Sequence, residues 1–151
     1  MSLNRVTPTD TTSTIEQKEA CMIANAQRAV FASTRWLTVE ELSKFVGLKE
    51  IDFRIRLNNW KSNNQIFTIE SDGIEYLPEY AFNLQEKYRP IKILIDIIAV
   101  FGNSKNGWGI AYWFASNNGY LGGRRPQDLL IAEPDAVLEA AKDEQLEICH
   151  G

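Results

Sequence analysis

Few residues of this chain have the types and spacing that catalysis requires. A nucleophile needs a positioned base beside it, and the single histidine, His150, is the penultimate residue. It follows Cys149 directly, but chain ends are the segments that most often fray, so we expect a loose end and no preorganised Cys–His pair. The other cysteine, Cys21, lies near the opposite end. We therefore expect neither a catalytic dyad nor a disulfide framework nor a zinc site.

Two glycine-containing loops have compositions that suit phosphate binding. Residues 102–109 lack the Lys-Ser/Thr pair that follows the last glycine of a P-loop. The run Gly122–Arg125 could hold an anion through backbone amides and two guanidinium groups, or it could be a tight turn flanked by solvated arginines, which we favour. An enzyme acting through this loop is the weakest function we consider. We expect no catalytic residue, no metal and no cofactor.

Composition and charge restrict the class of protein. The 151 residues are 44% hydrophobic and include four tryptophans, which is enough for a folded core. The net charge of -4 means that any nucleic-acid contact must come from a local basic face. The longest apolar stretch, residues 91–101, is too short to span a bilayer, and the polar start of the chain is no signal peptide. We expect a soluble, cytoplasmic protein.

The first element is a helix after a polar start. Residues 1–14 are Thr-rich and predict a flexible tail, and Ser13 and Glu16 have the spacing of a capping box. A helix over residues 15–31 should follow. Its apolar residues near one face are Ile15, Met22, Ile23, Ala26 and Val30. That face could pack inside the domain or against a second copy of the chain. A second copy, in a homodimer, is therefore one expected partner.

The next segment has the pattern of a helix-turn-helix followed by a hairpin. Thr38 and Glu41 form a second capping box, which opens a short helix that Gly47 ends. Residues 48–60 have helical spacing, and residues 65–77 alternate around the dipeptide Asp72-Gly73, a strong hairpin signal. Expected core residues here are Leu42, Val46, Leu48 and Phe53. Residues 36–77 therefore resemble a winged helix-turn-helix.

For DNA contact, the second helix of such a module should present basic and polar side chains. The candidates are Lys49, Arg54, Arg56, Asn58 and Lys61. Over residues 49–65, four Lys or Arg against two Asp or Glu give a balance of +2, which is modest for a DNA-binding helix. Because helix-turn-helix modules also serve purely as protein contacts, both interpretations stay open.

The rest of the chain predicts further helices. Pro90 is placed to begin an apolar helix that Gly102 ends, residues 108–116 predict another, and Pro134 begins a last amphipathic helix. The expected fold is mainly α with a small β-hairpin. It comprises a winged-helix-like module with its leading helix over residues 15–85, and a small helical domain over residues 86–151.

The C-terminal half resembles a known family. From Trp108 the sequence reads WGIAYWFASNNGYLGGRRPQDLLIAEPDAVLEAAKDE, with a Trp-containing helix, an Asn turn, Leu-x-Gly, Pro before Asp-Leu-Leu, and a helix with small residues. These features fall on Trp113, Asn117, Leu121, Gly123, Pro126, Asp128, Leu129, Leu130, Val137 and Ala141. The pattern is similar to the toxin-binding domain shared by the Xre, MbcA and ParS antitoxins of bacteria.

The resemblance implies a protein partner. Family members bind a toxin, often one with the RES domain that consumes NAD, and many repress their own operon through an N-terminal helix-turn-helix. The residues that the resemblance assigns to the partner contact are Trp113, Asn117, Leu121, Gly123, Arg124, Arg125 and Pro126. The N-terminal half departs from the usual family pattern, because its sequence predicts a wing and an additional helix before the helix-turn-helix.

We therefore expect a non-catalytic, antitoxin-like protein that binds a toxin and can bind operator DNA. The alternative is a stand-alone helix-turn-helix regulator of transcription, in which the C-terminal domain serves for oligomerisation.

Overall fold

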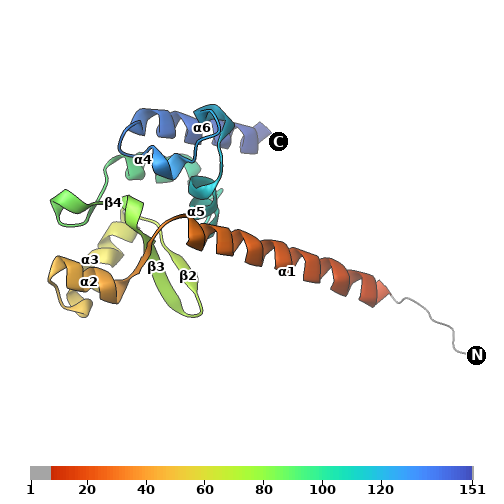
Figure 1. The fold of residues 1–151 in the computed structure, drawn as a ribbon, viewed down its shortest axis with the longest axis horizontal. Coiled ribbons are helices and arrows are strands. Elements are labelled where there is room, and N and C mark those ends of the chain that lie inside the picture. Colours follow the sequence, from red (N-terminus) through yellow and green to blue (C-terminus); the bar gives the residue numbers. More distant parts are fainter. Residues whose placement is uncertain (1–7, 151) are drawn as a thin grey trace, which may run out of the picture.

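A long helix, α1 (Pro8–Ser33), leads away from the rest of the molecule in the computed structural model of the chain, which describes the backbone of residues 8–150 (Figure 1). Its start corrects our prediction of a flexible tail through residue 14. Proline is favoured in the first turn of a helix, because its fixed φ is already helical and its missing N–H leaves no donor unpaired. Ser13 consequently lies within the helix and cannot be its N-cap, while residues 1–7 lie outside the described residues.

Only the last turns of α1 pack against the core. Val30 is buried, and the ring of Phe31 makes edge-to-face contacts with Trp36, Tyr76 and Trp108 at centroid distances of 6.2, 5.3 and 5.6 Å. Residues 14–25 are all exposed. The face predicted from the sequence is therefore buried at one end of the helix and open to solvent along the rest.

The capped helix that follows is confirmed. Strand β1 (Trp36–Thr38) leads into α2 (Val39–Val46), where Thr38 and Glu41 form the predicted capping box. Gly47 ends the helix with φ of 77°, a conformation that glycine adopts without strain. Helix α3 (Glu50–Ser62) comes next and buries Phe53, Leu57 and Trp60.

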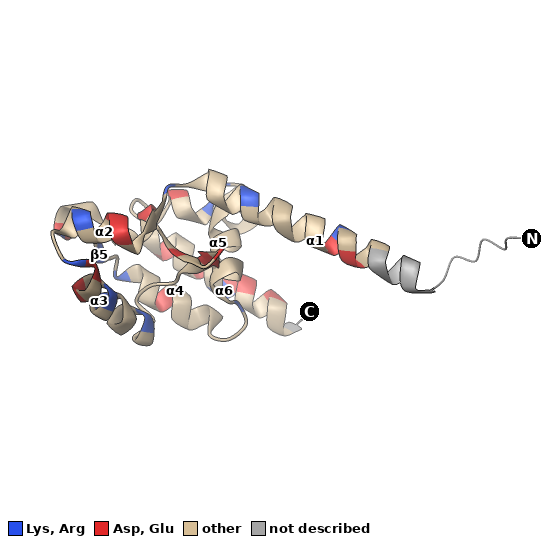
Figure 2. Cartoon of the chain, turned by 90° about the horizontal axis from the view of Figure 1, so that it is seen from below, with Lys and Arg blue, Asp and Glu red and all other residues tan. Residues whose placement is uncertain are grey.

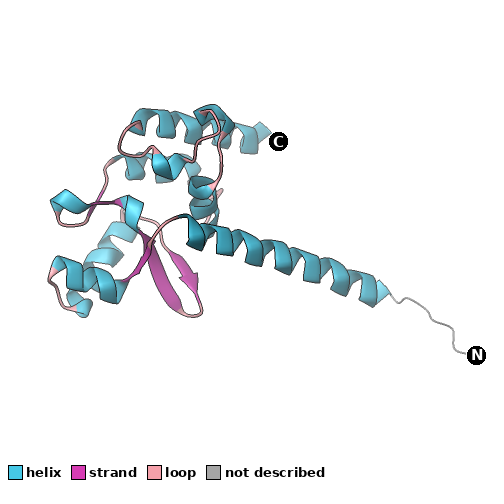
Figure 3. Cartoon of the chain, viewed as in Figure 1, coloured by secondary structure: helices cyan, strands magenta, loops and turns pink. Residues whose placement is uncertain are grey.

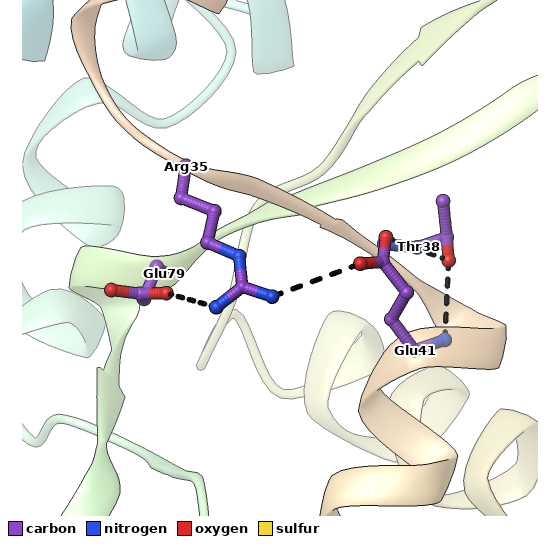
Figure 4. A network of polar contacts seen from close by, with 4 residues as sticks. All are labelled: Arg35, Thr38, Glu41 and Glu79. Atoms are coloured by element: carbon purple, nitrogen blue, oxygen red, sulfur yellow. Dashed lines mark hydrogen bonds and ion pairs between the residues drawn. The ribbon is translucent and has the colours of Figure 1, made fainter.

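An arginine ties these elements together (Figure 4). The guanidinium of Arg35 lies 3.4 Å from a carboxylate oxygen of Glu79 and 3.9 Å from one of Glu41. Because Glu41 also accepts hydrogen bonds from Thr38 in the capping box, the start of α2 is linked to the segment after the hairpin. All of these groups are at least partly exposed, so each ion pair contributes little by itself.

The predicted hairpin is present and a third strand joins it. Strands β2 (Ile69–Ser71) and β3 (Ile74–Pro78) are connected by Asp72 and Gly73, both with positive φ, as a two-residue hairpin turn requires. Strand β1 pairs with β3 in the order β1-β3-β2, a pairing that we did not predict. Two helices joined at a glycine and followed by the β2–β3 hairpin match the expected winged arrangement (Figure 3).

The connection to the second half differs from our prediction at Pro90. This residue pairs with Phe82 in a two-stranded ladder of β4 (Phe82–Asn83) and β5 (Arg89–Pro90), so it is extended rather than helical. Helix α4 (Ile93–Phe101) begins three positions later, with Lys92 at its N-cap, and Gly102 ends it as predicted.

The C-terminal half contains three helices that surround buried apolar side chains. After α4 come α5 (Gly107–Ala115), two short 3-10 turns, and α6 (Pro134–His150), which packs along α4. Our prediction of a loose C-terminus is corrected, because α6 continues as far as His150. No described helix has both the length and the apolar character needed to cross a bilayer.

The two halves share one hydrophobic core. Phe67, just before the hairpin, stacks on Phe114 of α5 with a centroid distance of 5.8 Å. The indole nitrogen of Trp108 donates to the backbone carbonyl of Glu70 at 3.2 Å. The buried cluster extends without interruption from Val30 in α1 to Ala141 in α6. The winged module and the helical unit therefore position each other.

Candidate protein-binding site

Three of the residues that the family resemblance assigns to a partner contact are buried. Trp113 lies between the rings of Phe101 and Phe114, at centroid distances of 5.1 Å to each, while Leu121 and Pro126 are also inside the protein. The indole nitrogen of Trp113 is buried without a hydrogen-bond partner among the described residues. These side chains therefore support the site mainly from inside the protein.

The loop between α5 and α6 is held in a closed turn. Asn118 donates its backbone N–H to the carbonyl of Arg124 at 3.1 Å and accepts the N–H of Gly123 at 2.8 Å. Its side-chain oxygen also accepts the N–H of Tyr120 at 2.9 Å. Gly122 and Gly123 both have positive φ, at 68° and 85°, which explains why glycine occupies these positions. The exposed part of the loop is therefore preorganised.

Both arginines of the loop already have carboxylate partners. Arg124 contacts Glu133 at 2.7 Å, and Arg125 makes two hydrogen bonds to Asp128, at 2.8 and 3.1 Å. The hydrogen bond with Asp128 raises the pKa of the Arg125 guanidinium above its ordinary value. The run of Gly and Arg is thus a turn with ion-paired arginines rather than a vacant anion site.

A pocket of about 380 Å³ lies between α5, this loop and α6. Tyr112 and Tyr120 line it and are each about half exposed, at 51% and 55%. Its acidic lining comes from α6 and consists of Asp143, Glu144 and Glu147. Lys105 offsets part of that charge, because its ammonium group lies 3.3 Å from Glu144. Asn117 also lines this pocket.

The chemistry of this pocket suits a cationic or hydrogen-bond-donating side chain held between aromatic rings. Carboxylates accept such donors, and a tyrosine ring attracts a cation over its face. Tyr112, Tyr120 and the acidic side of α6 were not predicted from the sequence. The two tyrosines flank the Asn117–Gly119 turn, and aromatic residues beside a predicted turn are the signal that could have identified them.

Two of the residues predicted to contact DNA are already ion-paired. Arg54 pairs with Glu50 at 3.0 Å, and Lys61 pairs with Glu75 of the hairpin at 2.6 Å. Both α2 and α3 carry acidic as well as basic residues, with the acidic ones in the first turn of each helix (Figure 2). Glu50 is already part of the predicted balance of +2, and Glu75 of the hairpin lowers that balance to +1.

The other candidates, Lys49, Arg56 and Asn58, are all exposed. Lys49 lies at the N-cap, and Arg56 lines a separate pocket beside the β4–β5 connection. Opposite the buried stripe, α3 exposes two isoleucines, Ile51 at 64% and Ile55 at 65%. An apolar ridge at the place where a DNA-reading helix would carry donors favours contact with protein.

The candidates for cysteine and metal chemistry are not brought together. Cys21 in α1 and Cys149 in α6 are free and exposed, and the side chain of His150 lies outside the described residues. Within the described part of the chain, no group of three or more His, Cys, Asp or Glu side chains could hold a metal ion.

Comparison with known proteins adds no relative. No protein-family model, curated protein or solved structure matches this chain.

Proposed function

We propose that this chain is a non-catalytic binding protein of the bacterial cytoplasm, of the antitoxin kind, which contacts a partner toxin through the pocket between α5 and α6. The observation that carries the proposal is the pair of exposed tyrosines, Tyr112 and Tyr120, beside the carboxylates of α6. Tyrosine is among the residues enriched where protein interfaces gain most of their binding energy. The carboxylates select a partner that presents Lys or Arg.

The resemblance of the C-terminal half supports the same surface. Asn117 and Gly123, two exposed motif residues, belong to the loop beside this pocket, and the buried Trp113 is part of the pocket lining. A preorganised contact surface needs exposed residues in a fixed turn and buried residues that hold the turn in place, and this motif contains both. The free, exposed thiols of both cysteines suit the reducing cytoplasm.

The test is neutralisation of a RES-domain toxin from the same genome. Expression of that toxin alone should deplete NAD and stop growth, and co-expression of the full chain should restore both. Replacing Tyr112→Ala and Tyr120→Ala together should remove the protection and weaken the isolated complex at least tenfold, as loss of interface anchors does. The matched control is Ile131→Ala, because Ile131 is 86% exposed and lies outside this pocket.

Two results would contradict the proposal. One is failure of the purified chain and toxin to form a complex under conditions in which established pairs associate. The other is full protection by the double tyrosine variant, which would move the contact elsewhere on the molecule.

A second candidate function is regulation of transcription, with the C-terminal unit serving for oligomerisation. It is favoured by the arrangement of α2, α3 and the hairpin, and by two α3-region cations without a carboxylate partner among the described residues, Lys49 and Arg56. It predicts salt-sensitive DNA binding that Arg56→Ala weakens. Arg54→Ala should weaken it less, because Glu50 already neutralises Arg54. DNA binding unchanged in both variants, or absent at low salt, would refute this candidate.

A further inference from the structure

A pocket of about 780 Å³ opens between α3 and the β4–β5 connection. Three basic residues from three different elements line it: Arg56 of α3, Arg89 of β5 and Lys92 at the N-cap of α4. Arg56 precedes Arg89 by 33 positions and Lys92 follows Arg89 by three, so the fold brings α3 and the β4–β5 connection to one site. All three side chains are exposed to solvent.

These cations differ from most others in the protein. Along the described chain, ion pairs engage Arg35, Lys44, Arg54, Lys61, Lys105, Arg124, Arg125 and Lys142. By contrast, the side chains of Arg56, Arg89 and Lys92 make no ion pair or side-chain hydrogen bond with any described residue. One carboxylate, Glu86, lines the same pocket, so three positive charges and one negative leave a net charge of +2.

Amide side chains supply the remaining polar groups. The side-chain oxygen of Asn59 accepts a hydrogen bond from Asn63, and that of Asn83 accepts the backbone N–H of Gln85, so both keep their NH2 donors. Gln65 also lines the pocket. Asn and Gln amides match the donor and acceptor edges of nucleobases, and guanidinium groups match phosphate oxygens. The pocket volume lies in the range typical of small-molecule sites.

We propose that this pocket binds a nucleoside polyphosphate, with its phosphates on Arg56, Arg89 and Lys92 and its nucleoside toward the amides. A bound polyanion would relieve the mutual repulsion of three cations that lack a carboxylate partner. A DNA duplex fits the observations less well, because the outward ridge of α3 is apolar at Ile51 and Ile55. The site is separate from the pocket proposed for the toxin and does not depend on that proposal.

The test is calorimetric titration of the full chain with ADP, pyrophosphate and adenosine at low salt. ADP should bind. Pyrophosphate and adenosine should each bind at least tenfold more weakly, because pyrophosphate lacks the nucleoside and adenosine lacks the phosphates. Arg56→Ala and Arg89→Ala should each weaken ADP binding about tenfold or more, the usual effect of removing a charge-assisted hydrogen bond. Two variants serve as matched controls. Arg54→Ala removes an α3 cation that is ion-paired with Glu50 and does not line the pocket. Lys87→Ala removes an exposed cation of the β4–β5 connection that does not line the pocket either.

Circular dichroism should show that the variants remain folded, since the replaced side chains are exposed. The proposal is overturned if ADP does not bind, or if the pocket variants bind it as well as the controls do. Equal affinity for pyrophosphate and ADP would refute the nucleoside part. Tighter binding of a short DNA duplex than of ADP, lost in the same two variants, would assign these cations to DNA instead.

Discussion

At the scale of single residues, Gly107 lets the two halves approach each other closely. A Cβ atom on Gly107 would lie 2.0 Å from the backbone carbonyl oxygen of Thr68, a distance that no side-chain rotation can relieve. Gly107→Ala should therefore force α5 and the start of the hairpin apart. We expect a loss of about 1–3 kcal/mol of unfolding free energy, typical of an overpacked site, measured by urea denaturation followed through tryptophan fluorescence.

The control for this prediction is Gly119→Ala. A Cβ at Gly119 meets nothing within 4 Å and needs no unusual backbone conformation, so the denaturation midpoint should hardly change. Equal stability of the two variants would show that the halves do not approach as closely as described.

A second residue, Tyr80, carries a hydroxyl group that is buried without a hydrogen-bond partner among the described residues. Its ring packs against Trp36, Phe67 and Phe114, so Tyr80→Phe keeps the aromatic contacts and removes only the unpaired oxygen. Since an unsatisfied buried polar group costs about 1–3 kcal/mol, the substitution should raise the unfolding free energy at neutral pH by about 1 kcal/mol. Tyr120→Phe, at an exposed position, is the control.

The same residue predicts a pH dependence. Burial raises the pKa of the Tyr80 hydroxyl well above its ordinary value of about 10. Because the pKa of Tyr80 is higher in the folded than in the unfolded chain, its ionisation does not change the unfolding free energy below pH 10. As the pH rises from 10 toward the folded-state pKa, the unfolding free energy falls. The stability gap between Tyr80→Phe and the unsubstituted chain should widen above pH 10. A constant gap across that range would contradict a buried, protonated hydroxyl.

At the scale of elements, local signals were predicted well from the sequence. The capping box of Thr38 and Glu41 and the Asp72-Gly73 turn depend on residues within four positions of each other, so the sequence contains all the information that they need. Interactions across longer distances escaped prediction. Pro90 satisfies the rules for a helix start, but its pairing with Phe82 keeps it extended and delays α4 until Ile93.

The same limit explains which parts of the candidate sites could be foreseen. The basic residues of α3 were identifiable by type, but Lys61 is neutralised by Glu75, which follows fourteen positions later in the hairpin. The convergence of Arg56 with Arg89 depends on the connection between β4 and β5, which has no strong periodic pattern. A count of charges along one helix therefore overestimates its basic surface and misses the pocket beside it.

At the scale of the whole molecule, residues 14–25 of α1 are exposed and extend away from the shared core (Figure 1). Ile15 and Met22 are seven positions apart and Ala26 follows four later, the spacing of a two-helix contact. Met22 is 70% exposed and Ile23 is 59% exposed, whereas Val30 on the adjoining face is already buried. We expect this face to pack against the same face of a second copy, giving a dimer of twice 17.2 kDa.

Sedimentation equilibrium of the full chain measures this association directly. Met22→Lys places a charge in the middle of the contact and should weaken the dimer at least tenfold, because an unpaired charge would be taken out of water. Ala24→Lys adds the same charge to the same helix two positions later, which is about 200° around its axis, so it should leave the dimer intact. A chain that sediments as a monomer at every concentration, or variants that dissociate equally, would show that α1 does not join two copies. In that case the exposed apolar face of α1 would be available to a different protein, and the toxin contact would have to be sought on α1 as well as on the pocket between α5 and α6.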